Sequence, residues 1–292
     1  MKILLAGGSG QLAQELQPIL LSSGEVIALD RTRLDLSQPE SIRQAMAEIK
    51  PDLVINSGAY TAVDKAESEP ELAYAVNAIA PGIFAEECEK QGASLIHFST
   101  DYVFDGSHGS AYLETDSTNP LGTYGKSKLA GEAAILKSGN RHIIIRTAWV
   151  YGNGGKGNFV KTMLRLGKER EEIRVVADQI GSPTWTRDLG AATSQIIPLL
   201  GPETFGTYQY TNSGVCSWYD FAIAIFEEAA QLGFPLKVQR VIPITTAEYP
   251  TPAKRPAFSV LSTVKISALL GTYPPHWRQG LRQMLAREVS RF

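Results

Sequence analysis

The segment between residues 99 and 128 includes a hydroxyl, a carboxylate, a phenol and an amine whose spacing suggests acid–base chemistry. Thr100 and Asp101 follow the apolar run LIHF at 95–98, and Tyr124 and Lys128 come shortly after them. Residues four positions apart lie on one face of a helix, and a nearby ammonium group favours the phenolate. We therefore expect Lys128 to lower the pKa of Tyr124 and fit it for acid–base catalysis, with Thr100 bonded to a substrate oxygen.

The spacing of Tyr124 and Lys128 is weak evidence by itself. The chain has 11 tyrosines, so a lysine four positions after one of them can arise by chance. The pair becomes informative because it follows a strand that ends in Ser99 and Thr100 and lies downstream of a glycine-rich turn.

That turn follows the first apolar run of the chain. Gly7, Gly8 and Gly10 come directly after KILLA at 2–6, and Ala13 completes either G-x-G-x-x-A or G-x-x-G-x-x-A. Glycines let the backbone approach a pyrophosphate, which the N–H groups of the following helix then bind. A tight turn without a ligand is the alternative, but an acid about twenty residues further on, Asp30, strengthens the dinucleotide interpretation.

Cofactor choice depends on residues 30–33. Asp30 ends the second predicted strand, where a carboxylate binds the ribose 2′-hydroxyl of NAD. Arg31 and Arg33 follow, and arginine can bind the 2′-phosphate of NADP, although a solvated turn is the alternative for both. We therefore expect both NADH and NADPH to be used.

The elements that must position these residues follow from the hydrophobic pattern. The short apolar runs are continuous rather than alternating, as in strands covered on both faces. Longer segments of helical period separate them, so the first 150 residues predict an α/β fold with a Rossmann-type doubly wound parallel sheet. The runs lie at 2–6, 26–29, 53–56, 95–98 and 143–146.

The pattern changes after Tyr151 and predicts a smaller, interleaved α/β substrate lobe. We expect the dinucleotide-binding domain to comprise residues 1–150 with parts of about 173–200 and 258–292. The substrate lobe would then comprise about 151–172 and 201–257.

Composition excludes several classes of partner. The chain has 292 residues with a net charge of −2, which offers no basic surface to nucleic acid or an anionic membrane. No apolar stretch is long enough to span a bilayer, and the run at 2–6 is too short for a signal peptide. The two distant cysteines, Cys88 and Cys216, favour a reducing compartment, so we expect a cytoplasmic protein.

Several stretches resemble a known family. Thr100, Tyr124, Lys128 and the glycine turn together resemble the extended short-chain dehydrogenases/reductases. Within that superfamily, the chain is similar along nearly its whole length to the dTDP-4-dehydrorhamnose reductases (dTDP-L-rhamnose synthases). The matching stretches are GGSGQLAQEL, INSGAYTAVDKAE, FSTDYVFDG, NPLGTYGKSKLAGE, IIIRTAWVYG, DQIGSPTWTRDL and RPAFSVLSTVK.

The resemblance implies a role for each matching position. Tyr124 would donate the proton, and Lys128 would hold the nicotinamide ribose. Residues that would contact the substrate are Thr100, Asp101 and Trp149, although the residues alone favour a core aromatic for Trp149. Residues that would contact the cofactor are Gly7, Gly10, Gln11 and Leu12 at the pyrophosphate, Asp30 and Arg31 at the ribose, Asp35 and Leu36 beside the adenine, and Ala59, Tyr60 and Thr61 after the third strand.

The implied reaction is the NAD(P)H-dependent reduction of the C4 keto group of dTDP-4-dehydro-L-rhamnose to give dTDP-L-rhamnose. The substrate would thus be a dTDP-linked 4-keto-6-deoxy sugar. Two alternatives remain: another nucleotide-sugar ketoreductase, epimerase or dehydratase of the same fold, and a non-catalytic dinucleotide-binding regulatory subunit. Tyr102 stands where such dehydratases place an acid, and the intact Thr100, Tyr124 and Lys128 argue against the regulatory subunit.

Some members of the family bridge two subunits through a metal held by carboxylates. Glu15 matches one ligand position, but Arg187 stands where another is expected, with Asp188 beside it. We therefore expect no metal site and no need for Mg²⁺, in a monomer or a homodimer.

Overall fold

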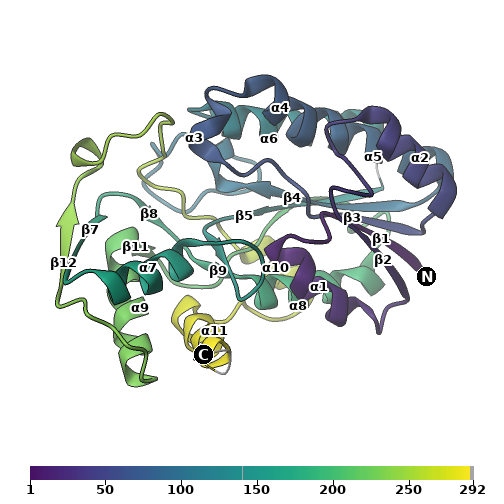
Figure 1. Ribbon diagram of the computed structural model, residues 1–292. Coiled ribbons are helices and arrows are strands. Elements are labelled where there is room, and N and C mark those ends of the chain that lie inside the picture. Colours follow the sequence, from purple (N-terminus) through teal and green to yellow (C-terminus); the bar gives the residue numbers. More distant parts are fainter. Residues whose placement is uncertain (140, 290–292) are drawn as a thin grey trace.

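The computed structural model describes residues 1–139 and 141–289. Within them, the largest sheet has six parallel strands in the order β2–β1–β3–β4–β5–β10 (Figure 1). All five apolar runs form strands of this sheet, which confirms the predicted Rossmann-type architecture. The strands are β1 (Lys2–Ala6), β2 (Glu25–Leu29), β3 (Leu53–Asn56), β4 (Ser94–Thr100), β5 (His142–Thr147) and β10 (Gly206–Gln209).

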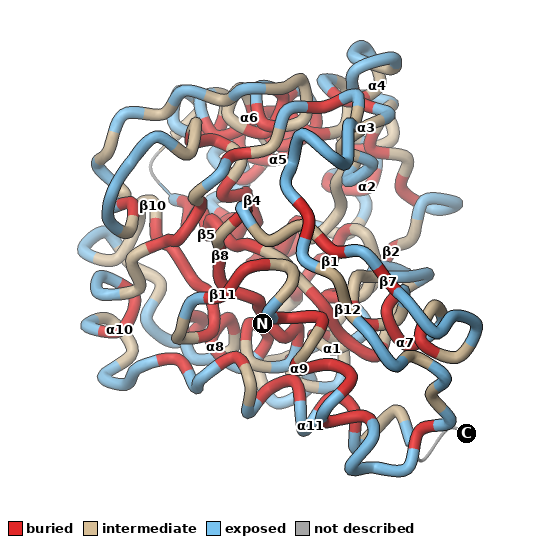
Figure 2. Tube along the Cα trace, turned by 90° about the vertical axis from the view of Figure 1, so that its left-hand side faces the viewer, coloured by how far each residue is buried: buried red, intermediate tan, exposed pale blue. Residues whose placement is uncertain are grey.

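Helices cover both faces of the sheet. Three of them, α1 (Gln11–Leu20), α8 (Thr186–Ile196) and α10 (Val264–Leu270), share a hydrophobic core with one face. The opposite face packs against α2 (Pro39–Ile49), α5 (Ala80–Gln91) and α6 (Thr123–Ser138). Figure 2 shows the strands buried between these two layers. The continuous apolar runs are explained because helices cover both faces, and β1, β3, β4 and β5 are almost entirely buried.

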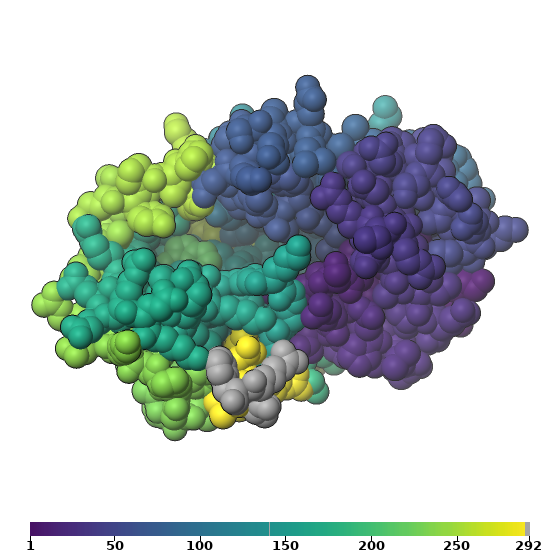
Figure 3. Space-filling model, in the orientation of Figure 1, coloured from purple at the N-terminus to yellow at the C-terminus, as the bar shows by residue number. Residues whose placement is uncertain are grey.

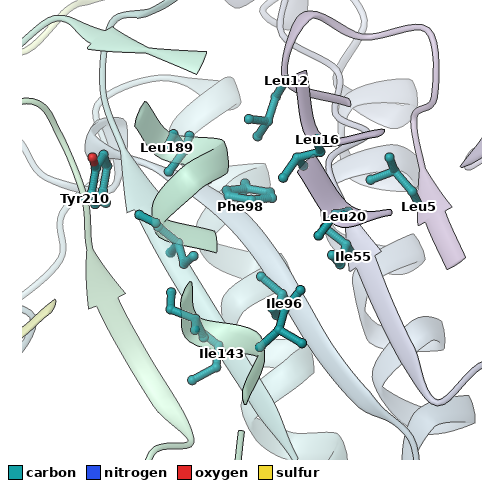
Figure 4. Packing of buried hydrophobic residues seen from close by; sticks show 14 of the residues in the cluster. Leu5, Leu12, Leu16, Leu20, Ile55, Ile96, Phe98, Ile143, Leu189 and Tyr210 are labelled. Atoms are coloured by element: carbon teal, nitrogen blue, oxygen red, sulfur yellow. The ribbon is translucent and has the colours of Figure 1, made fainter. Parts of the chain in front are cut away.

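Strand β4 carries the first half of the predicted site. Ile96 and Phe98 point into the core under α1 and α8, where Figure 4 shows Phe98 between Leu16 and Leu189. Because side chains alternate along a strand, His97 and Ser99 point toward the other layer, which contains α6. Thr100 ends the strand and pairs in register with Thr147 at the end of β5.

The smaller lobe has its own core, built around Tyr151, Trp185 and Phe221. Its strands form the pairs β7–β12, β8–β11 and β6–β9. Its elements are β6 (Val150–Tyr151), α7 (Phe159–Glu169), β7 (Glu172–Val176), β8 (Ile180–Gly181), β9 (Thr184–Trp185), β11 (Cys216–Ser217), α9 (Trp218–Gln231), β12 (Arg240–Ile244) and α11 (Trp277–Val289).

Five elements lie outside the lobe in which the sequence placed them: β7, β8, β9, β10 and α11. Strand β10 comes from the stretch 201–257, yet it pairs with β5 and buries Tyr208 in the main core. Conversely, β7 pairs with β12, and α11 packs Leu281 and Met284 into the core of the smaller lobe. These placements depend on contacts between distant segments, so local hydrophobic patterns could not distinguish the two lobes.

Several short elements connect β3 with α5 and follow β4. Asn77 lies within a π-helical turn, Ala75–Ile79, a form that often marks functional sites.

Pro18 lies in the last turn of α1, which ends at Leu20. No helix among the described residues is both long and apolar enough to cross a membrane. The remaining short elements are α3 (Val63–Ala66), α4 (Pro70–Tyr74) and the 3₁₀ turns Asp101–Val103, Ile197–Leu199 and Thr246–Glu248.

Candidate active site

The predicted pyrophosphate turn lies where the strand order reverses, between β1 and β3. Gly7 has a φ of +81°, and a Cβ atom there would lie 2.7 Å from the Cα of Gly58. Gly10 is the N-cap of α1 and offers no capping side chain, so the first N–H groups of this helix are free to bind an anion. Ligands of open α/β sheets bind at this position, and the close approach of the two turns fits a dinucleotide.

Asp30 stands at the end of β2, as predicted. The Oδ1 of Asp30 accepts two hydrogen bonds from Thr32, one from the backbone N at 3.0 Å and one from the hydroxyl at 2.6 Å. The hydroxyl of Thr32 keeps the pKa of Asp30 below its usual value, so the carboxylate stays charged. Arg31 and Arg33 are exposed, and the Arg31 guanidinium lies 3.9 Å from Asp35.

The turn after β3 forms a second wall. Leu36 is buried and packs directly against this turn. The contact is so close that a Cβ on Gly58 would lie 2.5 Å from the Cδ1 of Leu36. Asn77 holds the backbone of Tyr60 from both sides: its Oδ1 accepts from Tyr60 N at 2.8 Å, and its Nδ2 donates to Tyr60 O at 3.0 Å. Asn77 also donates to the hydroxyl of Ser127 on α6 at 3.1 Å.

Sequence reasoning missed Asn77. The signal available was a lone asparagine in the apolar stretch YAVNAIAPG, but nothing local shows that it faces Tyr60. Through Ser127, which donates to the backbone oxygen of Tyr124 at 2.8 Å, Asn77 links the predicted cofactor wall Ala59–Tyr60–Thr61 to the catalytic helix.

Thr100, Asp101 and Tyr124 meet at the end of β4. The Thr100 hydroxyl donates to Asp101 Oδ1 at 3.1 Å and accepts from the backbone N of Tyr102 at 3.2 Å. Burial raises the pKa of Tyr124 to about 12, while a hydrogen bond with Thr100 opposes the increase. The phenol therefore keeps its proton at neutral pH and is suited to donate it.

Lys128 is buried and lies against β4 rather than against the phenol. Its Nζ donates to the backbone oxygen of Phe98 at 2.6 Å and lies 3.2 Å from His97 Nε2. Burial lowers the pKa of Lys128 to about 8, which Glu132 partly opposes. The prediction that Lys128 lowers the pKa of Tyr124 is wrong in this structure, because the cost of burying a phenolate decides the direction of the shift.

Asp101 is a buried acid in the same site. Burial raises its pKa to about 6, and hydrogen bonds with the side chains of Ser259 and Thr100 partly oppose this increase. Its Oδ2 has no hydrogen-bond partner among the described residues, so a polar atom at the end of β4 is left for a ligand. Ser259 belongs to the matching stretch RPAFSVL, but the sequence analysis gave it no role. Its backbone N donates to Ile180 of the smaller lobe at 2.8 Å.

A buried ion pair supports this arrangement from behind. Glu132 of α6 accepts from Arg146 Nη2 at 2.7 Å and from the Ser99 hydroxyl at 2.5 Å. All three side chains are buried. The pair thus connects α6, β4 and β5 directly beside Thr100 and one helical turn from Lys128.

Trp149 follows β5 at the same edge of the sheet. It has a φ of +47°, a left-handed backbone that is rare for a bulky residue and that occurs preferentially at functional sites. Its ring stacks on Trp218 with centroids 3.5 Å apart and planes 6° from parallel. The ring is only partly buried and packs against the core of the smaller lobe and against a small cluster around Phe104 and Tyr112. These features favour a surface for a ligand, and the substrate role of Trp149 stays a prediction.

The residues considered for a metal have other partners. Glu15 lies 3.7 Å from the Arg287 guanidinium, and Asp188 accepts from Asn212 Nδ2 at 2.6 Å. Arg187 is exposed. Over the described part of the chain, no three histidine, cysteine or acidic side chains form a group that could hold a metal ion. Independence of metal remains a prediction for experiment.

The structure thus brings the predicted residues to one edge of the sheet. The turns after β1, β2 and β3 surround the dinucleotide position, and the ends of β4 and β5 face the smaller lobe (Figure 1). Figure 3 shows the surface hollowed between the blue residues of the first lobe and the teal and yellow-green residues of the second. Such a cleft can place a cofactor on one side and a second substrate on the other.

Comparison with known proteins gives a consistent result. Residues 1–290 match the family model described as RmlD substrate binding domain. The chain is 45% identical to a dTDP-4-dehydrorhamnose reductase of Escherichia coli K12, over 98% of this chain and 97% of that protein. It is similar to the crystal structure of a dTDP-4-dehydrorhamnose reductase from Bacillus anthracis in complex with NADP, with a TM-score of 0.90, 40% identity, and coverage of 98% and 99% of the two chains.

Proposed function

The chain belongs to the RmlD substrate binding domain family, and we propose that it reduces the C4 keto group of dTDP-4-dehydro-L-rhamnose to give dTDP-L-rhamnose. The cofactor is NADPH or NADH, as the NADP complex of a relative supports. When bound, the reduced nicotinamide supplies the hydride. The observation that carries the proposal is the convergence of Thr100, Asp101, Tyr124 and Lys128 beside a dinucleotide turn.

The residues of this chain then have separate tasks. Tyr124 holds a proton at neutral pH and delivers it to the oxygen at C4. Thr100 binds that oxygen and orients the phenol, and Asp101 offers its free Oδ2 to a sugar hydroxyl. Lys128 reaches the nicotinamide ribose from α6. The first turn of α1 and Asp30 hold the pyrophosphate and the adenosine ribose.

One assay tests the function. Purified protein is mixed with dTDP-4-dehydro-L-rhamnose and NADPH, and the loss of NADPH absorbance is compared with the amount of dTDP-L-rhamnose formed. A reductase consumes one NADPH for each product molecule. A nucleotide-sugar epimerase would change the sugar without net consumption, and a regulatory subunit would change neither compound. Repeating the assay with NADH measures the cofactor preference.

The setting of the reaction is part of the proposal. Cys88 and Cys216 are both free and buried, which supports a reducing, cytoplasmic location. We propose a monomer or homodimer that works without a bridging metal.

A further inference from the structure

A buried chain of polar side chains lies behind Lys128. Asn56 at the end of β3, His97 in β4 and Lys128 in α6 are at most 2% exposed. Asn56 Nδ2 lies 3.2 Å from His97 Nδ1, and His97 Nε2 lies 3.2 Å from Lys128 Nζ. Buried polar groups this close must match donors with acceptors, so the contacts restrict where each proton can be.

The amide of Asn56 fixes the tautomer of His97. Asn56 Oδ1 accepts from the backbone N of Gly58 at 3.2 Å, so the amide nitrogen faces the imidazole. That nitrogen can only donate, and His97 Nδ1 must therefore accept. Burial holds the pKa of His97 well below its usual value, so the ring is neutral. A neutral ring that accepts at Nδ1 carries its hydrogen on Nε2, which points at Lys128.

Lys128 must then accept a hydrogen bond, which an ammonium group cannot do. A neutral amine can accept from His97 Nε2–H and still donate to the backbone oxygen of Phe98 at 2.6 Å. To charge Lys128 in place, the hydrogen of His97 must move to Nδ1. Asn56 must then turn over, and it loses its hydrogen bond from Gly58 N.

Gly58 is close to the cofactor position. It precedes the wall Ala59–Tyr60–Thr61 and contacts the turn at Gly7. We propose that Asn56 and His97 are positioning residues that couple the proton on Lys128 to the Gly58 turn and thereby to the cofactor. The inference rests on the proposed function in one respect, because there Lys128 holds the nicotinamide ribose.

Other charged groups near Lys128 act on it differently. Glu132, one turn along α6, favours the ammonium form and is itself paired with Arg146 of β5. Asp101, after β4, raises the pKa of Tyr102 and of Tyr124, which like Lys128 belongs to α6. From the neighbouring helices, Glu67 caps α6 at Thr123, Glu69 holds the Tyr60 hydroxyl, and Glu86 and Glu87 pair with Arg43.

The tautomer can be observed without any substrate. Nitrogen-15 NMR of histidine-labelled protein distinguishes Nδ1–H, Nε2–H and charged rings, and the His97→Gln variant identifies the His97 signals. We expect a neutral Nε2–H ring at high pH that changes to Nδ1–H as Lys128 is charged, between about pH 10 and about pH 6. A charged ring, or a tautomer that does not change with pH, would overturn the coupling.

Cofactor binding provides the second test. NADPH affinity is measured against pH by fluorescence in the wild type, His97→Gln and Asn56→Ala, with His142→Gln as a control for the loss of another buried histidine. Affinity should weaken as pH rises through the pKa of Lys128. In the relay variants His97→Gln and Asn56→Ala, the pH at which NADPH affinity is lost should rise by about one unit. Neither variant forces Lys128 to accept a hydrogen bond, so its ammonium form is no longer disfavoured. The control should leave that pH unchanged.

The two tests separate the possible failures. Equal pH profiles for all four proteins, with melting temperatures that show they are folded, would overturn the relay while the reductase assay stands. If no protein bound NADPH, the proposed function would fail, and the NMR titration would still decide the coupling.

Discussion

Tyr124 keeps its proton because the site is a poor environment for a phenolate. Its pKa is raised to about 12, whereas an acid catalyst in a reduction needs only to release the proton as negative charge forms on the substrate oxygen. Thr100 hydrogen-bonds with the phenol, and we expect it to bond the substrate oxygen as well. We therefore expect burial to hold the proton until the reaction creates a stronger base on the substrate.

We expect Tyr124→Phe to lower kcat by about 10²–10⁴-fold, because it removes the proton donor and little else. NADPH affinity should change little. Tyr102→Phe is the matched control, since its ring packs edge-on against Tyr124 with centroids 5.5 Å apart. Steady-state kinetics with the 4-keto sugar measures both. Full activity in Tyr124→Phe would contradict the assignment.

Asp101 should reduce stability in exchange for function. Its pKa of about 6 lies above that of an aspartate in the unfolded chain, so the folded protein binds the proton more tightly. The free energy of unfolding therefore falls as pH rises from about 4 to about 6, and the cost persists above that range.

The variant Asp101→Asn removes this cost. A shift of about two pKa units corresponds to about 3 kcal/mol, so Asp101→Asn should be more stable than the wild type by up to that amount at pH 8 but not at pH 4. Urea unfolding at the two pH values measures the difference. Its kcat/KM should fall, since stabilising changes at active sites commonly reduce activity. Equal stability differences at both pH values would refute the account.

At the scale of elements, the site depends on α6 being fixed to the ends of β4 and β5. The Glu132–Arg146 pair does this from within the protein, and Ser99 adds a third bond. A buried ion pair contributes little net stability when intact, but it is costly to break because one charge is left without a partner.

We expect Glu132→Gln to lower the free energy of unfolding by about 3–5 kcal/mol. Glu227→Gln is the control, because the Glu227–Arg278 pair is on the surface and should cost less than about 1 kcal/mol. Denaturant titrations of both variants compare the two. If both variants lost the same free energy of unfolding, the buried pair would not be what holds α6 to the sheet.

The loop after β5 places Trp149 on Trp218 of α9, so that the site joins the two lobes. Trp149→Ala should raise the KM for the nucleotide sugar about tenfold, in line with the loss of aromatic stacking, and leave NADPH affinity nearly unchanged. Trp218→Ala removes the partner ring alone. If Trp149→Ala instead lowered the free energy of unfolding by about 3–5 kcal/mol, as is typical of truncating a buried tryptophan, Trp149 would have a core role.

The same elements show what the sequence could predict. The strands and the glycine turn are encoded locally, by continuous apolar runs and by glycines at a fixed spacing. Asn77, His97 and Glu132 were missed because their partners lie on other elements: only the folded sheet brings β3, β4 and α6 together. The pKa of Tyr124 was predicted in the wrong direction for a related reason, since helical spacing reveals the neighbour but not the burial.

At the scale of the molecule, the two lobes exchange segments along the chain. Strand β10 completes the large sheet, and α11 completes the core of the smaller lobe. The chain therefore crosses the cleft several times, and Ser259 approaches the end of β4 on one of these crossings. This interleaving fixes the lobes to each other around the site and explains why a single boundary near residue 150 does not describe them.

The last prediction concerns assembly of the whole molecule. Glu15 interacts with Arg287, and Asp188 is bonded to Asn212, so these carboxylates already have partners within one chain. Arg187 adds a positive charge at the position where the family resemblance implies another ligand. Treatment with EDTA should therefore change neither the molar mass measured by light scattering nor the rate of NADPH oxidation. A control sample receives EDTA followed by excess Mg²⁺. A loss of mass or rate that Mg²⁺ restores would show that carboxylates of two chains share a metal.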